Sequence, residues 1–370
     1  MVWIGAKKSK LFLTKEFKIK NLDKFEKWQW LDGDLIEDGF DNFNYGWGNG
    51  GDCARKTKIG SWFQSNCEYL APFVCERNVP RVIGSFGGKY KYNEDFKLQN
   101  SETLQIERDL VSGLSIRPIL ENHCTVYYKG EVWAFGGDGE PTGSFRLSNG
   151  SWSPGPTMPI ARTRHSCTVH ERQVWICGGQ TPEGEPLNDC VNFTLTPDTL
   201  GIFGHDMADF FEAPELAETR PRTPNLVSTT RGLYIIGGTF ETRLTEIVPT
   251  GMNQWAPTSP LPFSLIESTA AVLDDIIYLI GGLLDSSEES ANVLTLSPGS
   301  MYWEWAGSMA LPRSGHAAAP VPGAGKIIIQ GGRGLRSDEV WFRNDTTLVI
   351  DQYSHNRLGS SLLVLPGEFA

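Results

Sequence analysis

Arginine and histidine side chains recur just before short apolar strands, and no other residues of this chain are better suited to bind a charged group. Arginine presents a planar fork of donors that matches a carboxylate. The recurrence predicts a basic surface that receives a carboxylate or an acidic peptide. The alternative is that several of these side chains pack inside the fold and donate to loop carbonyls; the segment at Ser264 has no arginine. The candidates for a partner-binding face are Arg117, Arg162, Arg164, His165, Arg220, Arg222, Arg313, His316 and Arg357.

Signals for catalysis or metal binding are weak. The spacing locates no Ser-His-Asp triad and no carboxylate pair, and the seven cysteines form no CxxC doublets of a zinc site. Three of the six histidines, His123, His165 and His316, recur at the same step of a repeat, which indicates a structural role rather than a unique metal cage. We therefore expect a binding protein with no catalytic residues, no metal and no cofactor.

The cysteines and possible glycosylation sites indicate the compartment. Either Cys177–Cys190 or Cys167–Cys177 would cross a hairpin, buried free thiols are a third alternative, and the spacing does not choose among them. Cys124 has no assigned partner. The sequence motif for N-glycosylation occurs at three asparagines, and with the cysteines it favours the secretory pathway and an extracellular protein. These asparagines are Asn149, Asn192 and Asn344.

A glycine doublet follows a short apolar strand six times, at intervals of 42 to 59 residues. A nearly continuous apolar run such as Val174-Trp-Ile-Cys177 is expected of a strand buried on both faces. Glycine accepts a positive φ without penalty and lets two backbones approach closely. No GK[ST] sequence follows any doublet, so a phosphate loop is not predicted. The doublets are Gly87-Gly88, Gly136-Gly137, Gly178-Gly179, Gly237-Gly238, Gly281-Gly282 and Gly331-Gly332.

Three doublets are followed by a tryptophan and then a Leu-Pro or Met-Pro step, with Trp152, Trp255 and Trp305 as the tryptophans. This pattern closely resembles the kelch repeat over about 290 residues, and the resemblance implies a β-propeller with four strands in each blade. Six doublets predict six blades within residues 79–370. The strand at 82–86 lacks an inner neighbour, so we predict that the C-terminal strand within 357–365 completes the first blade. Residues 201–222 form a longer insertion that either contacts a partner or is a solvated loop.

Residues 1–78 carry a second resemblance. The motifs Trp3-Ile-Gly, Trp30-Leu-Asp-Gly, Gly60-Ser-Trp and Phe73-Val-Cys-Glu follow one another as in the C-terminal half of a C-type lectin-like domain. The resemblance implies a small partial α+β domain in which Cys53 pairs with Cys67, and in which the partner of Cys75 lies upstream of Met1. The segment that aligns with the family's calcium motif is Trp62-Phe-Gln, in which Phe63 offers no oxygen ligand and Gln64 offers no charge.

The composition narrows the remaining function classes. The net charge of −11 argues against binding to nucleic acid or anionic lipid, and no apolar run is long enough to span a bilayer. A signal peptide is absent from the first residues, which we attribute to a missing upstream segment. The sequence predicts a mainly β, non-enzymatic extracellular recognition protein whose propeller face binds a protein or a glycan. The alternatives are a calcium-dependent lectin, an intracellular kelch-type adaptor and a copper enzyme that resembles galactose oxidase.

Overall fold

The computed structural model describes most of the chain beyond residue 120, and it also describes the strands that lie before that residue. Of the side chains in the strands before residue 121, only Phe86 is described. The chain divides into two compact units, Met1–Val79 and Pro80–Ala370. The strands described before residue 121 lie between residues 2 and 109, and the later described ranges are 121–148, 151–196, 207–321, 325–333, 338–343, 346–350 and 359–365.

The first unit contains a three-stranded sheet in the order β1-β4-β5 and a β2-β3 hairpin. Its sheet pairs the Trp3-Ile-Gly segment with the strand that begins at Cys53. Cys67, Cys75 and the cysteine side chains expected to form the first disulfide lie outside the described part. The strands are β1 (Val2–Ile4), β2 (Phe17–Leu22), β3 (Phe25–Trp30), β4 (Cys53–Lys56) and β5 (Trp62–Ser65).

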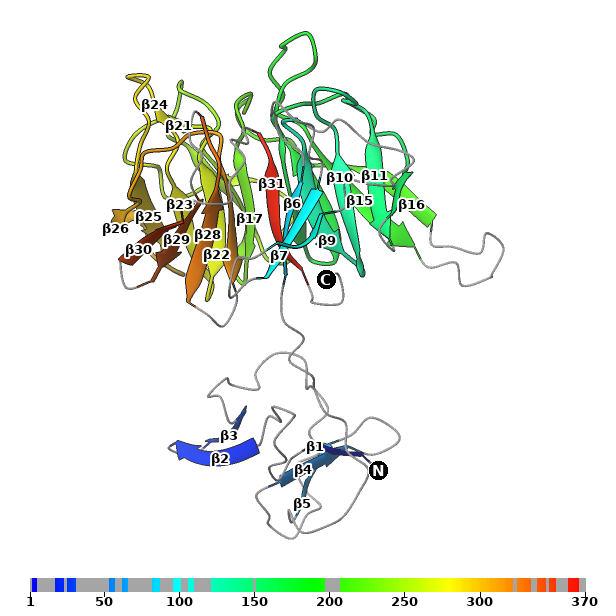
Figure 1. Ribbon diagram of the computed structural model, residues 1–370. Helices are drawn as coiled ribbons and strands as arrows, with labels where there is room; N and C mark the ends of the chain where they lie inside the picture. Colours follow the sequence, from blue (N-terminus) through cyan, green and yellow to red (C-terminus); the bar gives the residue numbers. More distant parts are fainter. Residues whose placement is uncertain are drawn as a thin grey trace. The chain divides into compact units, whose positions relative to one another are not determined.

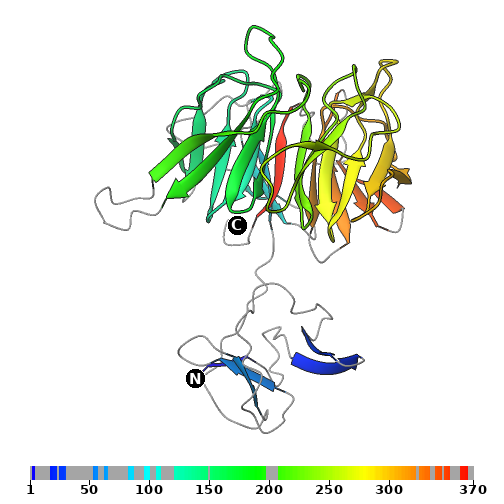
Figure 2. The ribbon, with the colours of Figure 1, turned by 180° about the vertical axis from the view of Figure 1, so that it is seen from behind.

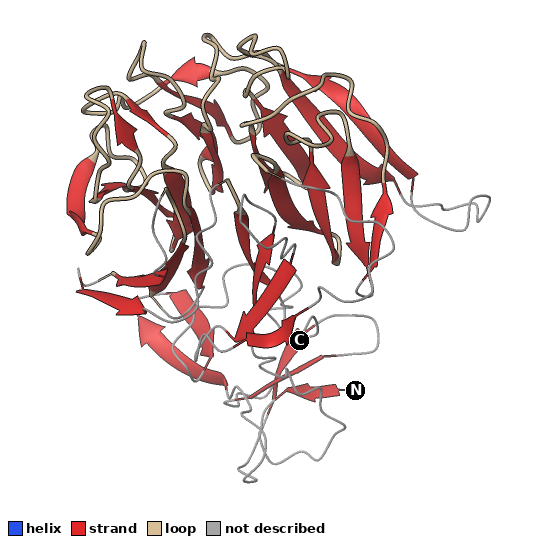
Figure 3. Cartoon of the chain, turned by 45° about the horizontal axis from the view of Figure 1, so that its top comes forward, coloured by secondary structure: helices blue, strands red, loops and turns tan. Residues whose placement is uncertain are grey.

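The second unit is a β-propeller, and the described residues hold no helix (Figures 1 and 3). Five consecutive four-stranded antiparallel sheets form blades that we label A to E. Blade A contains β9 (Cys124–Tyr128), β10 (Glu131–Phe135), β11 (Ser144–Ser148) and β12 (Ser151–Pro154). Blade B contains β13 (Ser166–His170), β14 (Gln173–Cys177), β15 (Cys190–Thr196) and β16 (Met207–Ala213). Blade C contains β17 (Asn225–Thr229), β18 (Gly232–Ile236), β19 (Thr245–Pro249) and β20 (Ala256–Pro257).

Blades D and E repeat this plan. Blade D contains β22 (Thr269–Leu273), β23 (Ile276–Ile280), β25 (Asn292–Leu296) and β26 (Glu304–Ser308), with a short pair β21 (Leu265–Ile266) and β24 (Leu283–Leu284) beside it. Blade E contains β27 (Ala317–Val321), β28 (Lys326–Gln330), β29 (Asp338–Phe342) and β30 (Thr346–Ile350).

A further four-stranded sheet joins the two ends of this unit. Its order is β31-β6-β7-β8, so the C-terminal strand pairs with the first strand of the unit, from Ser361 opposite Phe86 to Leu365 opposite Val82. The strand β31 lies next to the first strands of blades A and E. The strands are β6 (Val82–Phe86), β7 (Phe96–Asn100), β8 (Ile106–Asp109) and β31 (Ser361–Leu365).

The core lies between neighbouring sheets, because the second strand of each blade is buried on both faces. Val132, Trp133, Ala134 and Phe135 in β10 are each at most 2% exposed. The rings of Trp133 and Phe193 lie 4.7 Å apart across the boundary between blades A and B. Each such side chain contributes about 1.5–3 kcal/mol of transfer free energy. The apolar runs of the sequence therefore supply the contacts that hold the blades together.

The glycine doublets lie where adjacent blades meet. A Cβ atom on Gly136 would stand 2.6 Å from the carbonyl oxygen of Arg162, and one on Gly179 would stand 2.4 Å from that of Thr163. Both glycines also have positive φ, so no other residue fits either the space or the conformation. Gly87 and Gly88 lie outside the described residues.

Candidate recognition site at the channel mouth

The first strand of every blade, together with β31, lines a central channel with a cavity volume of about 360 Å³. Hydroxyl and amide side chains of this lining already bond one another across blade boundaries. The Thr125 and Ser361 hydroxyl oxygens are 2.5 Å apart, and Asn225 donates to Ser268 over 2.9 Å. No carboxylate, lysine or arginine lines this cavity among the described residues. The described channel lining is therefore uncharged and mixes polar side chains with small apolar ones.

A ring of backbone hydrogen bonds surrounds the mouth. Its members stand two residues before the strands that line the channel, and all have positive φ, between 51° and 68°. In five of them the N–H donates to the carbonyl of the equivalent residue in the neighbouring sheet, over 2.8–3.1 Å. In the sixth, Glu267 donates to Arg222 over 3.5 Å, which closes the ring. The members are Asn122, Arg164, Thr223, Glu267, Gly315 and Gly359.

Three of the arginines predicted for the binding face are buried, and for them the prediction is wrong. Arg162, Arg220 and Arg313 are 0% exposed. Each guanidinium donates to the carbonyl of the first glycine of the doublet in its own blade, over 2.7–3.1 Å. Each also pairs with a carboxylate on the third strand of that blade or just before it. A buried charge must be paired, so these arginines serve the fold, as the alternative interpretation held.

The pair in blade E is the most enclosed of the three. Arg313 Nη2 lies 2.8 Å from Glu339 Oε1, and both side chains are 0% exposed. Glu339 also accepts hydrogen bonds from the backbone N–H groups of Ala310 and Leu311, over 2.8 Å and 3.1 Å. In blade C, Arg220 and Glu246 are 3.0 Å apart, and in blade B, Arg162 pairs with Asp189. In blades B, C and E, the loop that enters the blade is thereby fastened to the third strand of that blade or to the residue just before it.

The histidines of the predicted face are also buried, so the prediction is wrong for His165 and His316. His123, His165 and His316, which we call the mouth histidines, are 2–6% exposed. Burial lowers the pKa of His123 to about 3, and burial together with the nearby Arg313 guanidinium lowers the pKa of His316 to about 3. Burial, and then Arg162, lower the pKa of His165 well below its usual value. The rings are neutral near pH 7 and do not contribute charge to the surface.

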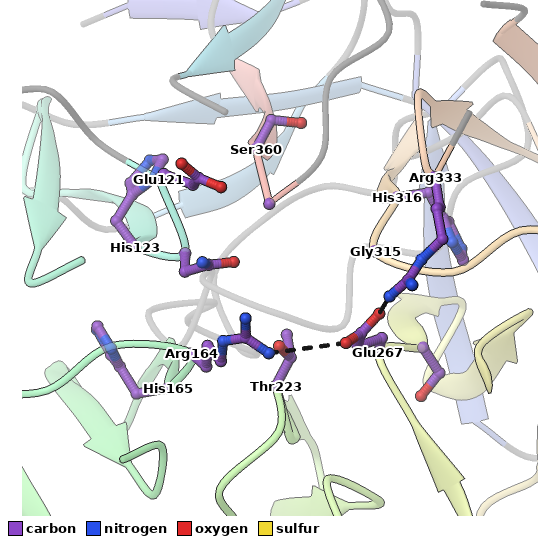
Figure 4. Close-up of a pocket in the computed structure, with 13 residues that line it drawn as sticks. Glu121, His123, Arg164, His165, Thr223, Glu267, Gly315, His316, Arg333 and Ser360 are labelled. Carbon is purple, nitrogen blue, oxygen red and sulfur yellow. Dashed lines mark hydrogen bonds and ion pairs between the residues drawn. The ribbon is translucent and has the colours of Figure 1, made fainter. Parts of the chain in front are cut away.

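The charged groups that remain accessible at the mouth form a small cluster (Figure 4). Arg333 Nη2 lies 3.0 Å from Glu267 Oε2, and Arg164 Nη1 lies 3.7 Å from Glu267 Oε1. The arginine side chains are 56% and 35% exposed, and the Glu267 side chain is 11% exposed. Arg222 is exposed on the adjacent loop. One carboxylate therefore serves two guanidinium groups, and Glu121 lines the same pocket as a second carboxylate.

Of the predicted face, the structure thus places Arg164 and Arg222 at the surface, and Arg117 and Arg357 lie outside the described residues. Sequence reasoning missed Arg333 and Glu267. Arg333 directly follows the doublet Gly331-Gly332, so a search of the residues after each doublet, as well as those before each first strand, would have found it.

The described cysteines form two disulfides. Cys177 pairs with Cys190 across β14 and β15, which is one of the two alternatives left open by the sequence. Cys124 pairs with Cys167 and links the first strands of blades A and B, so Cys167–Cys177 is wrong. Asn192 lies on β15, between β14 and β16, whereas Asn149 and Asn344 lie outside the described residues.

The described residues contain no cluster of three or more His, Cys, Asp or Glu side chains arranged to hold a metal ion. None of their segments is a helix long and apolar enough to cross a membrane.

The fold and the repeated contacts define a β-propeller, and sequence relatives support its kelch type. No family model matches the chain. Beta-scruin of Limulus polyphemus is 23% identical over 57% of this chain, and alpha-scruin of the same animal is 24% identical over 66%. Kelch-like protein 35 of Mus musculus is 26% identical over half of the chain. The matched segments cover 25%, 28% and 29% of these relatives, so this chain spans little more than a quarter of their lengths.

Proposed function

We propose that this propeller is a non-enzymatic recognition module that binds a segment of a partner protein across the channel mouth. The observation that carries the proposal is the cluster of Arg164, Arg333 and Glu267, because it keeps two guanidinium groups accessible beside a closed backbone ring. The kelch-type relatives favour protein recognition over catalysis. A glycan remains the alternative ligand.

The geometry favours a ligand that carries a carboxylate. The distance of 3.7 Å between Arg164 and Glu267 is longer than a charge-assisted hydrogen bond, so Arg164 gives up little when it turns to another acceptor. Arg333 is held more closely, at 3.0 Å, and keeps Glu267 in place. Arg222 stands next to Thr223, whose N–H donates to the Arg164 carbonyl over 2.9 Å, so it lies on the loop beside Arg164.

The test is selection from a displayed random-peptide library on the immobilised full chain. We expect enriched peptides to contain Asp or Glu, and we expect Arg164→Glu to lower their affinity about tenfold or more. Arg343→Glu is the matched control, because Arg343 is 51% exposed and pairs with Asp274 away from the mouth cluster. Peptides whose binding responds equally to both substitutions, or to neither, would show that the mouth is not the recognition surface.

We also propose that the sheet β31-β6-β7-β8 is a sixth blade that closes the ring. The pairing of β31 with β6 and the hydrogen bonds of Gly359 to both neighbouring loops support this closure. Closure removes an exposed sheet edge. Removal of residues 359–370 should then lower the melting temperature of the whole propeller in one transition. An unchanged melting curve would contradict a closed six-bladed ring.

We further propose an oxidising compartment, with the secretory pathway as the destination. The two disulfides support it, because structural disulfides persist mainly outside the cytosol. Four of the seven cysteines are in these pairs, so thiol titration of the denatured, unreduced chain should find at most three thiols. Seven thiols would favour the intracellular adaptor.

We also propose that residues 1–78 are a lectin-like unit that binds no calcium, and this proposal rests on the sequence motifs alone. Ligand binding that is insensitive to a chelator is expected, and calcium-dependent binding on a glycan array would favour the lectin alternative. Stoichiometric copper in the purified protein would favour the oxidase alternative.

A further inference from the structure

The outermost strand of blade B differs from the outer strands of the other sheets. The strand β16 has seven residues, whereas β8, β12, β20, β26 and β30 have two to five. Proteins usually keep edge strands short, because their free N–H and C=O groups invite another strand. The β15-β16 hairpin is the long green arm at the rim of the propeller in Figures 1 and 2. Blade B therefore offers the longest strand edge of the described sheets.

The two phenylalanines of this strand have different surroundings. The ring of Phe210 packs against Phe193 at 5.2 Å and Phe135 at 6.1 Å, so it belongs to the core between blades A and B. Phe211 points to the other side and is 52% exposed. An exposed phenylalanine on an edge strand is unfavourable in water, and a partner that covers it would gain apolar contact area.

The charge around Phe211 has one sign. Residues 207–219 contain four carboxylates and no lysine or arginine. Asp209, Glu212, Glu215 and Glu218 are all exposed. Within the described residues, no ion pair involves any of the four. This surface complements a basic partner.

The backbone of the strand is also available. The N–H of Phe210 donates to its neighbouring Asp209 carboxylate over 2.8 Å, and it therefore points away from β15. Alternate residues of a strand share this direction, so the N–H of Glu212 points outward as well. An added strand finds a donor at Glu212, and it gains a second at Phe210 when the Asp209 carboxylate turns to a basic side chain of that strand.

We infer that β16 is a docking edge for an extended, basic segment of a partner protein. This segment pairs with β16, places lysine or arginine beside Asp209 and Glu212, and covers Phe211 with an apolar side chain. This mode is strand addition, in which backbone bonds give affinity and side chains give specificity. A second copy of the chain is disfavoured, because two antiparallel β16 strands would bring like charges together. The edge is independent of the channel mouth and of the function proposed for it.

The probe is a capped eight-residue peptide of alternating lysine and valine, measured by fluorescence anisotropy on the full chain. We expect saturable binding that weakens with salt, while a peptide of alternating glutamate and valine does not bind. A lysine–valine peptide N-methylated at alternate residues should lose binding, because it cannot donate to β16. Hydrogen exchange of the Phe210 and Glu212 amides should slow when the unmodified peptide is bound.

The variants separate this edge from general attraction to an acidic protein. Asp209→Lys with Glu212→Lys should weaken binding about tenfold, and Phe211→Ser about fivefold. The double variant Asp285→Lys with Glu288→Lys changes the net charge equally on an exposed loop of blade D, and it should leave the affinity within about twofold. Arg164→Glu should also have no effect, which distinguishes this site from the mouth.

Three results would overturn the inference. They are equal loss of affinity in the two double variants, undiminished binding of the N-methylated peptide, and dimerisation through β16 in sedimentation. The peptide-side comparison needs only the unmodified chain, so it decides the matter even where a variant fails to fold.

Discussion

Substitution of Glu339 by glutamine tests whether the buried arginine–carboxylate pairs hold the blades in place. The change is nearly isosteric, so it removes charge and acceptor capacity without leaving a cavity. Glu339 accepts from Arg313 Nε at 3.2 Å and Nη2 at 2.8 Å, and from two backbone N–H groups. Glutamine has one acceptor oxygen and turns its NH2 group toward one of these donors. The Arg313 charge then loses the Glu339 carboxylate while it stays at 0% exposure.

The expected loss of unfolding free energy is about 3–5 kcal/mol, because a buried charge without its partner keeps its desolvation cost. At about 2 °C or more for each kcal/mol, the melting temperature should fall by roughly 6–10 °C. The measurement is thermal unfolding followed by circular dichroism and by tryptophan fluorescence, so that two probes report the same transition.

The control is Asp274→Asn, which breaks the pair of Asp274 with Arg343 on the surface. Exposed pairs contribute about 0–1 kcal/mol, so its melting temperature should change by about 2 °C at most. The double variant Arg313→Met with Glu339→Met removes both charges and should recover part of the loss. Equal melting temperatures for Glu339→Gln and Asp274→Asn would refute the reasoning, and a double variant no better than Glu339→Gln would show that the unpaired charge is not the cause.

Three further predictions concern the fold. The folded state lowers the pKa of the mouth histidines, so the unfolded chain binds more protons below about pH 6.5. The free energy of unfolding should therefore fall by up to about 1.4 kcal/mol per pH unit for each histidine as the pH decreases toward 3. Urea unfolding between pH 8 and 5 checks this, and an unfolding free energy that does not change with pH would contradict it. Gly179→Ala places a Cβ atom 2.4 Å from the carbonyl oxygen of Thr163 and should destabilise the folded state by several kcal/mol. Gly184→Ala has an equally positive φ but no atom within 4 Å, so it should cost only about 1–2 kcal/mol. Similar melting temperatures of the two variants would show that the close approach at Gly179 does not matter. Cys177→Ala with Cys190→Ala removes a disulfide whose cysteines are 13 residues apart, and it should lower the free energy of unfolding by about 3 kcal/mol. A reducing agent should then destabilise this variant less than it destabilises the unchanged chain.

Local patterns in the sequence were enough to predict the propeller. A glycine doublet after an apolar run carries its own physical reason, because only glycine fits the positive φ and the close backbone approach at Gly136 and Gly179. Continuous apolar runs likewise require a strand covered on both faces, as β10 is. Such constraints act within a few residues, so their periodicity is visible without a structure.

Equivalent positions in the sequence were less reliable guides to individual side chains. Trp305 was assigned to the repeat with Trp255, yet it is 65% exposed. The structural counterpart is Trp303, which donates to the Ser259 carbonyl as Trp255 donates to that of Pro214, both over 3.0 Å. The pairing of β25 with β26 also carries a register shift, which lies between Val293 and Leu294 and opposite Gly307 and Trp305. Register depends on the neighbouring strand, so single-strand patterns do not show it.

The tertiary structure alone decided which basic residues are buried and which stay accessible. Arg162 and Arg164 are two residues apart, but the first points between blades to a carboxylate and a glycine carbonyl, and the second points to the channel mouth. The carboxylates that pair with the buried Arg220 and Arg313 lie 26 residues further along the chain. An arginine fork binds a carboxylate of its own fold as readily as one from a ligand, so composition cannot distinguish the two. Only the position of the carboxylate in space separates a buried structural arginine from one that stays accessible to a ligand.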